Sequence, residues 1–364
     1  MERLTNFACG ALIGAFVTYR VLKQCDTNLK TESTVSGTAA KNSSSLSSVG
    51  SGKNDNDYDA SEFHVEQLSR NKLYFGDSGL VEITKASVVV VGLGGVGSHC
   101  AHLLARSGIK YISLVDFDQV TLSSTNRHAC ARLRDVGKSK VGVMKEFIGE
   151  ITISERQCKV NAIQKMFNDE TAVECLDGTL EENFSRHNYV LDCIDDIPTK
   201  AQLIKNCVDR GVRVLCSMGA GGKADPTRLH IGDLKSVSKD PMCTKLRWCL
   251  RKLKVDIDSP LIRILYSSEK VVAGLSKLTD EQVENPSEFG VVDNMRLRVL
   301  PVLGTMPAIM GQAMASYVLC EIGGKPYTPV TVERMGKSVR HKLLQHVKNR
   351  ESEARKEMEV SELL

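Results

Sequence analysis

The sequence contains no Cys-x-x-Cys pair, no Cys/His cluster with zinc-finger spacing and no internal repeat, although it has 12 cysteines among 364 residues. These absences argue against a structural zinc site and against a small disulfide scaffold. Irregularly spaced cysteines, many of them inside apolar runs, are typical of buried thiols in a reducing compartment. With 42% hydrophobic and 25% charged residues, the chain is neither fully disordered nor fibrous.

Excess charge of one sign is also nearly absent, because the formal net charge is only +4. This total hides two basic segments. Residues 235–254 contain seven Lys or Arg and one Asp, and residues 334–350 contain six Lys or Arg and no acidic residue. The rest of the chain is therefore acidic, and the small total does not exclude an anionic partner.

The N-terminus differs from the rest of the chain. Residues 6–22 read NFACGALIGAFVTYRVL, with Arg20 as the only charge. This length lies at the lower limit of about 17 residues for a spanning helix, so we expect residues 1–23 to be a membrane anchor. A cleaved signal peptide and a buried helix are the alternatives, and unpatterned cysteines argue against secretion. Residues 24–61 are rich in Ser, Gly, Asn and Asp, which predicts a flexible linker.

Alternating strand and helix patterns follow. The expected strands are Ser87–Gly92, Tyr111–Asp116, Cys158–Ile163, Tyr189–Cys193 and Arg213–Ser217. The expected helices between them are Val96–Ser107, Val136–Ile151 and Thr199–Arg210. This order predicts an α/β, Rossmann-like, doubly wound and mainly parallel sheet. The later part, Thr227–Val330, should extend the sheet and contain a helix at Thr305–Glu321, and residues 331–364 form a charged, helix-prone tail.

A glycine-rich turn joins the first expected strand to its helix. Its glycines are Gly92, Gly94, Gly95 and Gly97. Glycines there permit a tight turn and let backbone N–H groups approach a phosphate at the helix N-terminus. Asp116 ends the next strand, where a carboxylate can hold ribose hydroxyls. These two features predict a nucleotide site but fit NAD and ATP equally well.

Three further features favour ATP. Asp116 and Asp118 lead into Asn126 and Arg127, Lys140 opens the next expected helix, and Asp195 follows the fourth strand, where it can hold Mg²⁺. Cleavage of ATP between its α- and β-phosphates needs such charges, because negative charge grows there. Each feature alone also has a structural explanation: Arg127 as a surface ion pair, Asp195 as a helix N-cap. Their joint occurrence, in order, favours nucleotide chemistry.

From Arg70 to Lys140 the chain resembles the adenylating domain shared by ubiquitin-activating enzymes and bacterial activators of sulfur-carrier proteins. Within that superfamily it is most similar to the tRNA threonylcarbamoyladenosine dehydratases. Residues 126–129, NRHA, resemble their Asn-Arg-Gln-x-x-Ala, and residues 219–227, GAGGKADPT, match their GAGG-x-x-DPT. The resemblance covers residues 62–330, as a ThiF-type adenylating domain. The anchor, linker and tail resemble the fungal members, which sit on the mitochondrial outer membrane.

The resemblance implies roles for matching residues. The glycine turn, Asp116 and Asp118 would bind ATP; Asn126, Arg127 and Lys140 would contact its phosphates, and Asp195 would hold Mg²⁺. Arg70 would reach across a homodimer to the partner's ATP. Arg70, Arg127, Lys140 and Asp195 are thus the expected catalytic residues. The chain departs from the usual pattern at Ser124, His128 and Asp196, without losing a charged group.

The resemblance also implies a reaction and a substrate. Threonylcarbamoyladenosine next to the anticodon, in tRNAs that read codons beginning with adenine, would be dehydrated to its cyclic form through a carboxyl adenylate. The tRNA would bind Lys245, Arg247, Arg251, Lys252 and Lys254, which we expect on one helix with Trp248. The basic tail could instead contact anionic lipid. The alternatives are an activator of a ubiquitin-like or sulfur-carrier protein and an inactive membrane scaffold. An NAD oxidoreductase is disfavoured, because no hydride-transfer acid–base pair is evident.

Overall fold

The structure is a computed structural model of the chain. It describes residues 55–152, 158–177, 188–237, 240–271, 301–329 and 337–362. By its contacts the chain divides into two units, Met1–Lys53 and Asn54–Leu364. The expected anchor and most of the expected linker lie outside the described residues. Within the described part, no helix combines the length and the apolar character that a membrane crossing requires.

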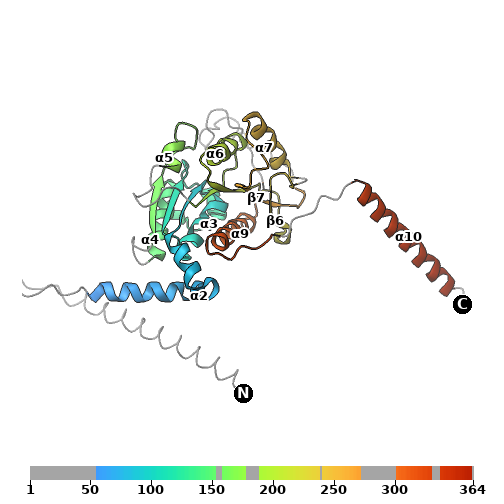
Figure 1. Cartoon of the computed structure of the whole chain (residues 1–364), viewed down its shortest axis with the longest axis horizontal. Helices are drawn as coiled ribbons and strands as arrows, with labels where there is room; N and C mark the ends of the chain where they lie inside the picture. Colours follow the sequence, from blue (N-terminus) through green and yellow to red (C-terminus); the bar gives the residue numbers. More distant parts are fainter. Residues whose placement is uncertain are drawn as a thin grey trace, which may run out of the picture. The chain divides into compact units, whose positions relative to one another are not determined.

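A seven-stranded sheet organises the second unit (Figure 1), with the strand order β3-β2-β1-β4-β5-β7-β6. All neighbouring strands pair in parallel except β6, which runs antiparallel to β7. The predicted Rossmann-like, mainly parallel sheet is confirmed, and β6 and β7 extend it as expected. The strands are β1 (Ser87–Val91), β2 (Tyr111–Val115), β3 (Lys159–Ile163), β4 (Tyr189–Asp192), β5 (Arg213–Ser217), β6 (Leu229–Gly232) and β7 (Ile262–Ser267).

The helices alternate with these strands. They are α2 (Asp55–Lys85), α3 (Gly95–Arg106), α4 (Lys140–Ile151), α5 (Ala172–Leu176), α6 (Ile197–Asp209), α7 (Pro241–Lys252), α9 (Thr305–Ile322) and α10 (Lys337–Glu362). Helix α2 begins inside the range assigned to the linker and is kinked at Gly76, where φ is 76°. Helix α10 lies in the expected helical tail.

One predicted helix boundary is wrong. The expected helix Val136–Ile151 begins only at Lys140. Gly137 has a φ of 88°, which is incompatible with a right-handed helix. Ser139 then caps α4, because its side chain accepts a hydrogen bond from the N–H of Gly142 at 3.2 Å. The correction places Lys140 at the first position of the helix.

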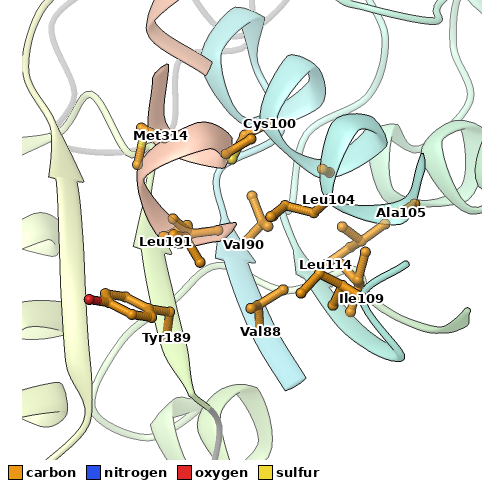
Figure 2. Close-up of a cluster of buried hydrophobic side chains, with 14 of the residues drawn as sticks. Val88, Val90, Cys100, Leu104, Ala105, Ile109, Leu114, Tyr189, Leu191 and Met314 are labelled. Atoms are coloured by element: carbon orange, nitrogen blue, oxygen red, sulfur yellow. The ribbon is translucent and has the colours of Figure 1, made fainter. Parts of the chain in front are cut away.

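The two faces of the sheet are covered by different helices. Along β1, Val88 and Val90 join one buried cluster with α3, α4 and α9, whereas Val89 and Val91 join a second cluster with α5, α6 and α7. Figure 2 shows the first cluster, in which Met314 of α9 and Cys100 of α3 close over Val90 and Leu191. All five β1 side chains are buried. Covering both faces explains the continuous β-branched run.

The strand order reverses direction at β1. Chain order runs outward from β1 through β2 to β3, and then returns to β4 on the other side of β1. In open α/β sheets, ligands bind beyond the carboxyl ends of the strands at such a point. The glycine turn after β1 and the acidic segment after β4 both lie at this edge.

Candidate functional site

The glycine turn is packed tightly on one side and open on the other. Gly92 has a φ of 90°, and a Cβ there would lie 2.8 Å from the carbonyl oxygen of Cys193. A Cβ on Gly97 would lie 1.9 Å from the carbonyl oxygen of Gly92. Around Gly94, the N-cap of α3, a Cβ would meet no atom within 4 Å. The open side therefore presents the N-terminus of α3, which suits a phosphate.

Asp116 fixes the turn against the end of β2. Its two carboxylate oxygens accept the N–H groups of Leu93 at 2.5 Å and of Asp118 at 2.8 Å. Burial raises the pKa of this carboxyl, and Lys140 together with these two N–H groups opposes the shift. Asp116 thus shapes the loop in addition to any contact with ribose.

Lys140 and Asp118 form an ion pair at the same edge. The Lys140 Nζ lies 2.5 Å from Asp118 Oδ2. The lysine is 11% exposed and the aspartate 42% exposed, so the pair faces solvent through its carboxylate. The structure therefore brings two of the predicted ATP-binding residues into contact, on the open side of β2 and α4.

Asn126 and Arg127 end a short 3-10 helix, Leu122–Asn126. The Arg127 guanidinium donates to the carbonyl of Ser123 at 2.9 Å and to Asn126 Oδ1 at 3.0 Å. A Cβ on Gly95 would lie 3.2 Å from the Cβ of Arg127, so this segment lies beside the first turn of α3. Asn126 and Arg127, two of the three residues predicted to contact phosphate, therefore lie beside the N-terminus of α3.

Three carboxylates at and just after the end of β4 have different surroundings. Asp192 is fully buried, and its Oδ1 lies 2.8 Å from Lys200 Nζ. Asp196, rather than Asp195, caps α6 by accepting from the N–H of Thr199 at 2.9 Å. Asp195 is exposed and has no hydrogen bond or ion pair with any other described residue. Its carboxylate is therefore available to a cation, and the N-cap explanation for Asp195 is wrong.

The loop 219–227 lies after β5 and is held from both sides. Lys223, which is buried, approaches Asp240 Oδ2 at 3.3 Å and the carbonyl of Ser267 at 3.4 Å. Glu269 accepts the N–H groups of Ala224 at 2.9 Å and of Asp225 at 2.8 Å. Because Asp240 is also the N-cap of α7, the buried ion pair ties this loop to the basic helix.

Helix α7 carries most of the predicted tRNA-binding residues. Lys245, Arg251 and Lys252 are exposed on it, and the Lys252 Nζ lies 3.7 Å from the centroid of the Trp248 ring. Trp248 is 58% exposed. The expectation that Lys254 lies on this helix is wrong. The helix ends at Lys252, and Lys254 has a φ of 57°, in the left-handed region.

Two other predicted residues have distinct surroundings. Arg247 donates to the carbonyls of Leu234 at 2.9 Å and Val237 at 2.8 Å, so it anchors the segment that precedes α7. Arg70 is exposed on α2, and none of the hydrogen bonds or ion pairs between described residues involves it. The Arg70 side chain therefore makes no hydrogen bond or ion pair with the described nucleotide-site residues of its own chain.

Sequence reasoning overlooked Lys200. Its Nζ contacts Asp192 and donates to the carbonyl of Ser217 at 3.0 Å. Burial opposes the positive charge, but the Asp192 carboxylate outweighs it, so the pKa of Lys200 lies above its ordinary value. The available signal was the pairing of a lysine on the first turns of α6 with an aspartate that ends the preceding strand.

The described cysteines bear out the interpretation of buried thiols. All ten are free and eight of them are buried. Burial raises the pKa of the thiols of Cys130 and Cys158 to about 12, and also raises the pKa of Cys216 well above its ordinary value. Thiols of this kind are poor nucleophiles. No cysteine is therefore assigned to the site.

The sequence was compared with protein families and with characterised proteins. The model of the ThiF family matches residues 68–360. The chain is 36% identical to tRNA threonylcarbamoyladenosine dehydratase 2 of Saccharomyces cerevisiae, over 74% of this chain and 59% of that protein. It is 36% identical to the Bacillus subtilis tRNA threonylcarbamoyladenosine dehydratase, over 57% of this chain and 77% of that protein. The chain thus spans less than two thirds of the yeast relative.

Solved structures of a bacterial dehydratase are also similar to this chain. The Escherichia coli tRNA N6-threonylcarbamoyladenosine dehydratase in complex with ATP is 26% identical in sequence, with a TM-score of 0.58. The alignment covers 73% of this chain and 97% of that one. The same bacterial protein in complex with AMP gives a TM-score of 0.59 at 27% identity. The similarity therefore extends over nearly all of the bacterial fold.

Proposed function

The chain belongs to the ThiF family, in its tRNA threonylcarbamoyladenosine dehydratase branch, and we propose that it dehydrates threonylcarbamoyladenosine next to the anticodon of tRNAs that read codons beginning with adenine. The reaction consumes ATP and gives the cyclic nucleoside. The observation that carries this proposal is the loop 219–227, which is held by Lys223 and Glu269 at the nucleotide edge and tied through Asp240 to the basic helix α7.

The proposed chemistry is activation of a carboxylate. An oxygen of the threonyl carboxylate attacks the α-phosphorus of ATP, which breaks the bond to the β-phosphate and releases pyrophosphate. The carbamoyl group of the same nucleoside then attacks the activated carbonyl carbon, loses a proton and expels AMP. Ring closure is intramolecular, so orientation supplies much of its rate. No enzyme nucleophile is required, in accord with the buried cysteines.

The charged residues have separate tasks in this scheme. Lys140 and Arg127 stabilise the negative charge that grows on the α-phosphate and on the leaving pyrophosphate. The N-terminus of α3 binds phosphate oxygens. Asp195 fits a Mg²⁺ ion, because its exposed carboxylate has no partner among the described residues. When bound, Mg²⁺ would neutralise phosphate charge.

A homodimer follows from the same assignment. Arg70 is exposed on α2 and has no described partner, so its guanidinium is available to a second copy of the chain. We assign it to the phosphates of the partner's ATP. Mixing an Arg70→Ala chain with a Lys140→Met chain tests this, because only the mixed dimer contains one intact site. Recovered AMP formation supports the assignment, and two inactive homodimers without recovery contradict it.

Helix α7 is the proposed tRNA surface. Lys245, Arg251 and Lys252 are exposed for phosphate contacts, and Trp248 is exposed for stacking on a base. Arg247 contributes by holding the segment before the helix. Lys254, although beyond the helix, remains exposed next to it. The N-terminal segment is proposed to anchor the protein in the mitochondrial outer membrane, with the catalytic body in the cytosol.

Nucleoside mass spectrometry tests the function. In cells that lack the protein, the cyclic nucleoside should disappear and the open form should remain, and the intact gene should restore the cyclic form. An Arg127→Ala gene should fail to restore it, which separates an enzyme from an inactive scaffold. Cyclic nucleoside that persists unchanged without the protein would overturn the proposal.

A further inference from the structure

His128 follows Arg127 in the loop between β2 and α4, and its imidazole is 6% exposed. Its Nδ1 accepts the N–H groups of Ala131 at 3.2 Å and of Cys130 at 3.4 Å. An imidazole nitrogen that accepts hydrogen bonds carries no proton, so the proton of the neutral ring is on Nε2. The local backbone therefore fixes the tautomer and presents Nε2–H as a donor.

The ring stays neutral at physiological pH. Burial and, to a smaller extent, Lys140, His99 and Arg127 lower the pKa of His128 to about 4, although Asp135 opposes the shift. Yet Nε2 is buried and has no hydrogen-bond partner among the described residues. A buried donor without an acceptor is destabilising, and folded proteins rarely retain one. The arrangement therefore suits an acceptor supplied by a ligand.

The surroundings indicate what that acceptor is. Lys140 and Arg127 carry positive charge near the ring, which favours an anionic oxygen. Asp135 is not the acceptor for the Nε2–H of His128, because its carboxylate pairs with Lys138 at 2.8 Å and accepts the N–H of Arg132 at 3.0 Å. Asp135, the acidic neighbour that raises the pKa of His128, thus already has other hydrogen-bond partners.

The backbone next to His128 is connected through a side chain to the glycine turn. Ser98 Oγ of α3 accepts the N–H of Ala129 at 3.0 Å and donates to the carbonyl of Gly94 at 2.7 Å. One side chain therefore couples the position of the histidine to the open end of the glycine turn. We propose that His128 donates a hydrogen bond from Nε2 to a phosphate oxygen of bound ATP. This inference rests on the proposed function, because it needs the nucleotide in that site.

Two substitutions separate the two ring nitrogens. His128→Asn keeps an acceptor near the position of Nδ1 but places no donor at Nε2. His128→Gln places an amide N–H near the position of Nε2. We would titrate each full-length protein with an ATP analogue that has a methylene group between its α- and β-phosphates, by calorimetry. A hydrogen bond to a charged group predicts that His128→Asn weakens binding about tenfold or more, and that His128→Gln stays within about threefold of wild type.

A second readout needs no variant. In wild-type protein labelled with ¹⁵N-histidine, adding the same analogue should shift the His128 Nε2 resonance and slow the exchange of its proton. This measurement decides the matter if His128→Asn does not fold. Equal affinity of His128→Asn and wild type, or an Nε2 signal that does not respond, would overturn the inference. Protein that binds the analogue as expected but forms no cyclic nucleoside would overturn the proposed function alone.

Discussion

Two of the lysine–aspartate pairs at the carboxyl edge of the sheet differ in what surrounds them. Lys200 and Asp192 are 2.8 Å apart and both are 0% exposed, whereas Lys140 and Asp118 are 2.5 Å apart with the aspartate 42% exposed. Lys200 also donates to the carbonyl of Ser217, so it links the ends of β4 and β5. The Lys140 Nζ, in contrast, has Asp118 as its only hydrogen-bond partner among the described residues.

The difference distinguishes a structural pair from a functional one. A fully buried ion pair cannot exchange its partner for a ligand without leaving a charge unpaired in the interior. A pair that opens to solvent through its carboxylate can, because water or phosphate can replace the partner at low cost. The same residue types therefore support the fold at β4, and at α4 they form the pair that we propose to bind ATP.

The largest expected effect is on stability, at the buried pair. Lys200→Met should lower the free energy of unfolding by about 3–5 kcal/mol, because it leaves Asp192 buried and unpaired. Urea denaturation of the full chain measures this. The double variant Asp192→Leu, Lys200→Met should recover most of the loss. A Lys200→Met protein as stable as wild type would show that the pair is not structural.

Substitution in the solvent-facing pair of Lys140 and Asp118 should reduce activity rather than stability. Lys140→Met should slow AMP formation by about 10²–10³-fold, the cost of removing one group that stabilises charge in a transition state. Its urea midpoint should hardly move. Lys138→Met is the matched control, because Lys138 lies two residues earlier and contacts Asp135 instead. If Lys140→Met were unstable but active, the two pairs would have been assigned in reverse.

Acid should lower the free energy of unfolding, because His128 must take up a proton in a buried position. Its pKa in the folded protein is about 4, below the ordinary 6.5, so the unfolded chain binds the proton more readily. Stability from this group is complete above pH 6.5 and is lost as pH falls from 6.5 towards 4, by up to about 3 kcal/mol. Denaturation curves at several pH values measure the slope. His128→Gln should show a shallower slope over this range, and an unchanged slope would contradict the assignment.

The smallest expected effect concerns the cations of the basic segment. Lys245 is exposed on α7, and no described residue pairs with it, whereas Lys235 lies 2.9 Å from Asp258. Lys245→Ala should weaken tRNA binding and reduce the slope of log affinity against log salt by about one. Lys235→Ala should change it less, because its charge is already balanced. Filter binding at several salt concentrations measures both, and equal slopes for Lys245→Ala and wild type would exclude α7 from the tRNA surface.

Much of this edge could be predicted from the sequence, because local patterns determine it. The β-branched run from Ser87 indicates a strand buried on both faces, and the glycines after it indicate a turn that backbone sterics require. Lys140 was expected near the start of a helix, although the expected start at Val136 is four residues too early. These features depend on neighbours in the chain, so a single sequence contains them.

The rest depends on which side chains meet once the chain is folded. Lys200 has the pattern of a polar residue on an amphipathic helix, and only the pairing with Asp192 shows that it is buried. The roles of Asp195 and Asp196 could not be separated, because either can precede α6 and the cap is decided by which carboxylate reaches Thr199. The end of α7 was misplaced because residues 251–254, RKLK, have helix-forming side chains throughout.

The central claim is that the site activates a carboxylate by adenylation, and transfer of an isotope tests it most directly. The threonyl carboxylate of the modified adenosine in tRNA would be labelled with ¹⁸O and incubated with the purified full chain and ATP. Adenylation predicts one ¹⁸O in the phosphate of AMP for each cyclic nucleoside formed, because the attacking carboxylate oxygen leaves with AMP. Cyclic nucleoside formed together with unlabelled AMP would contradict the account.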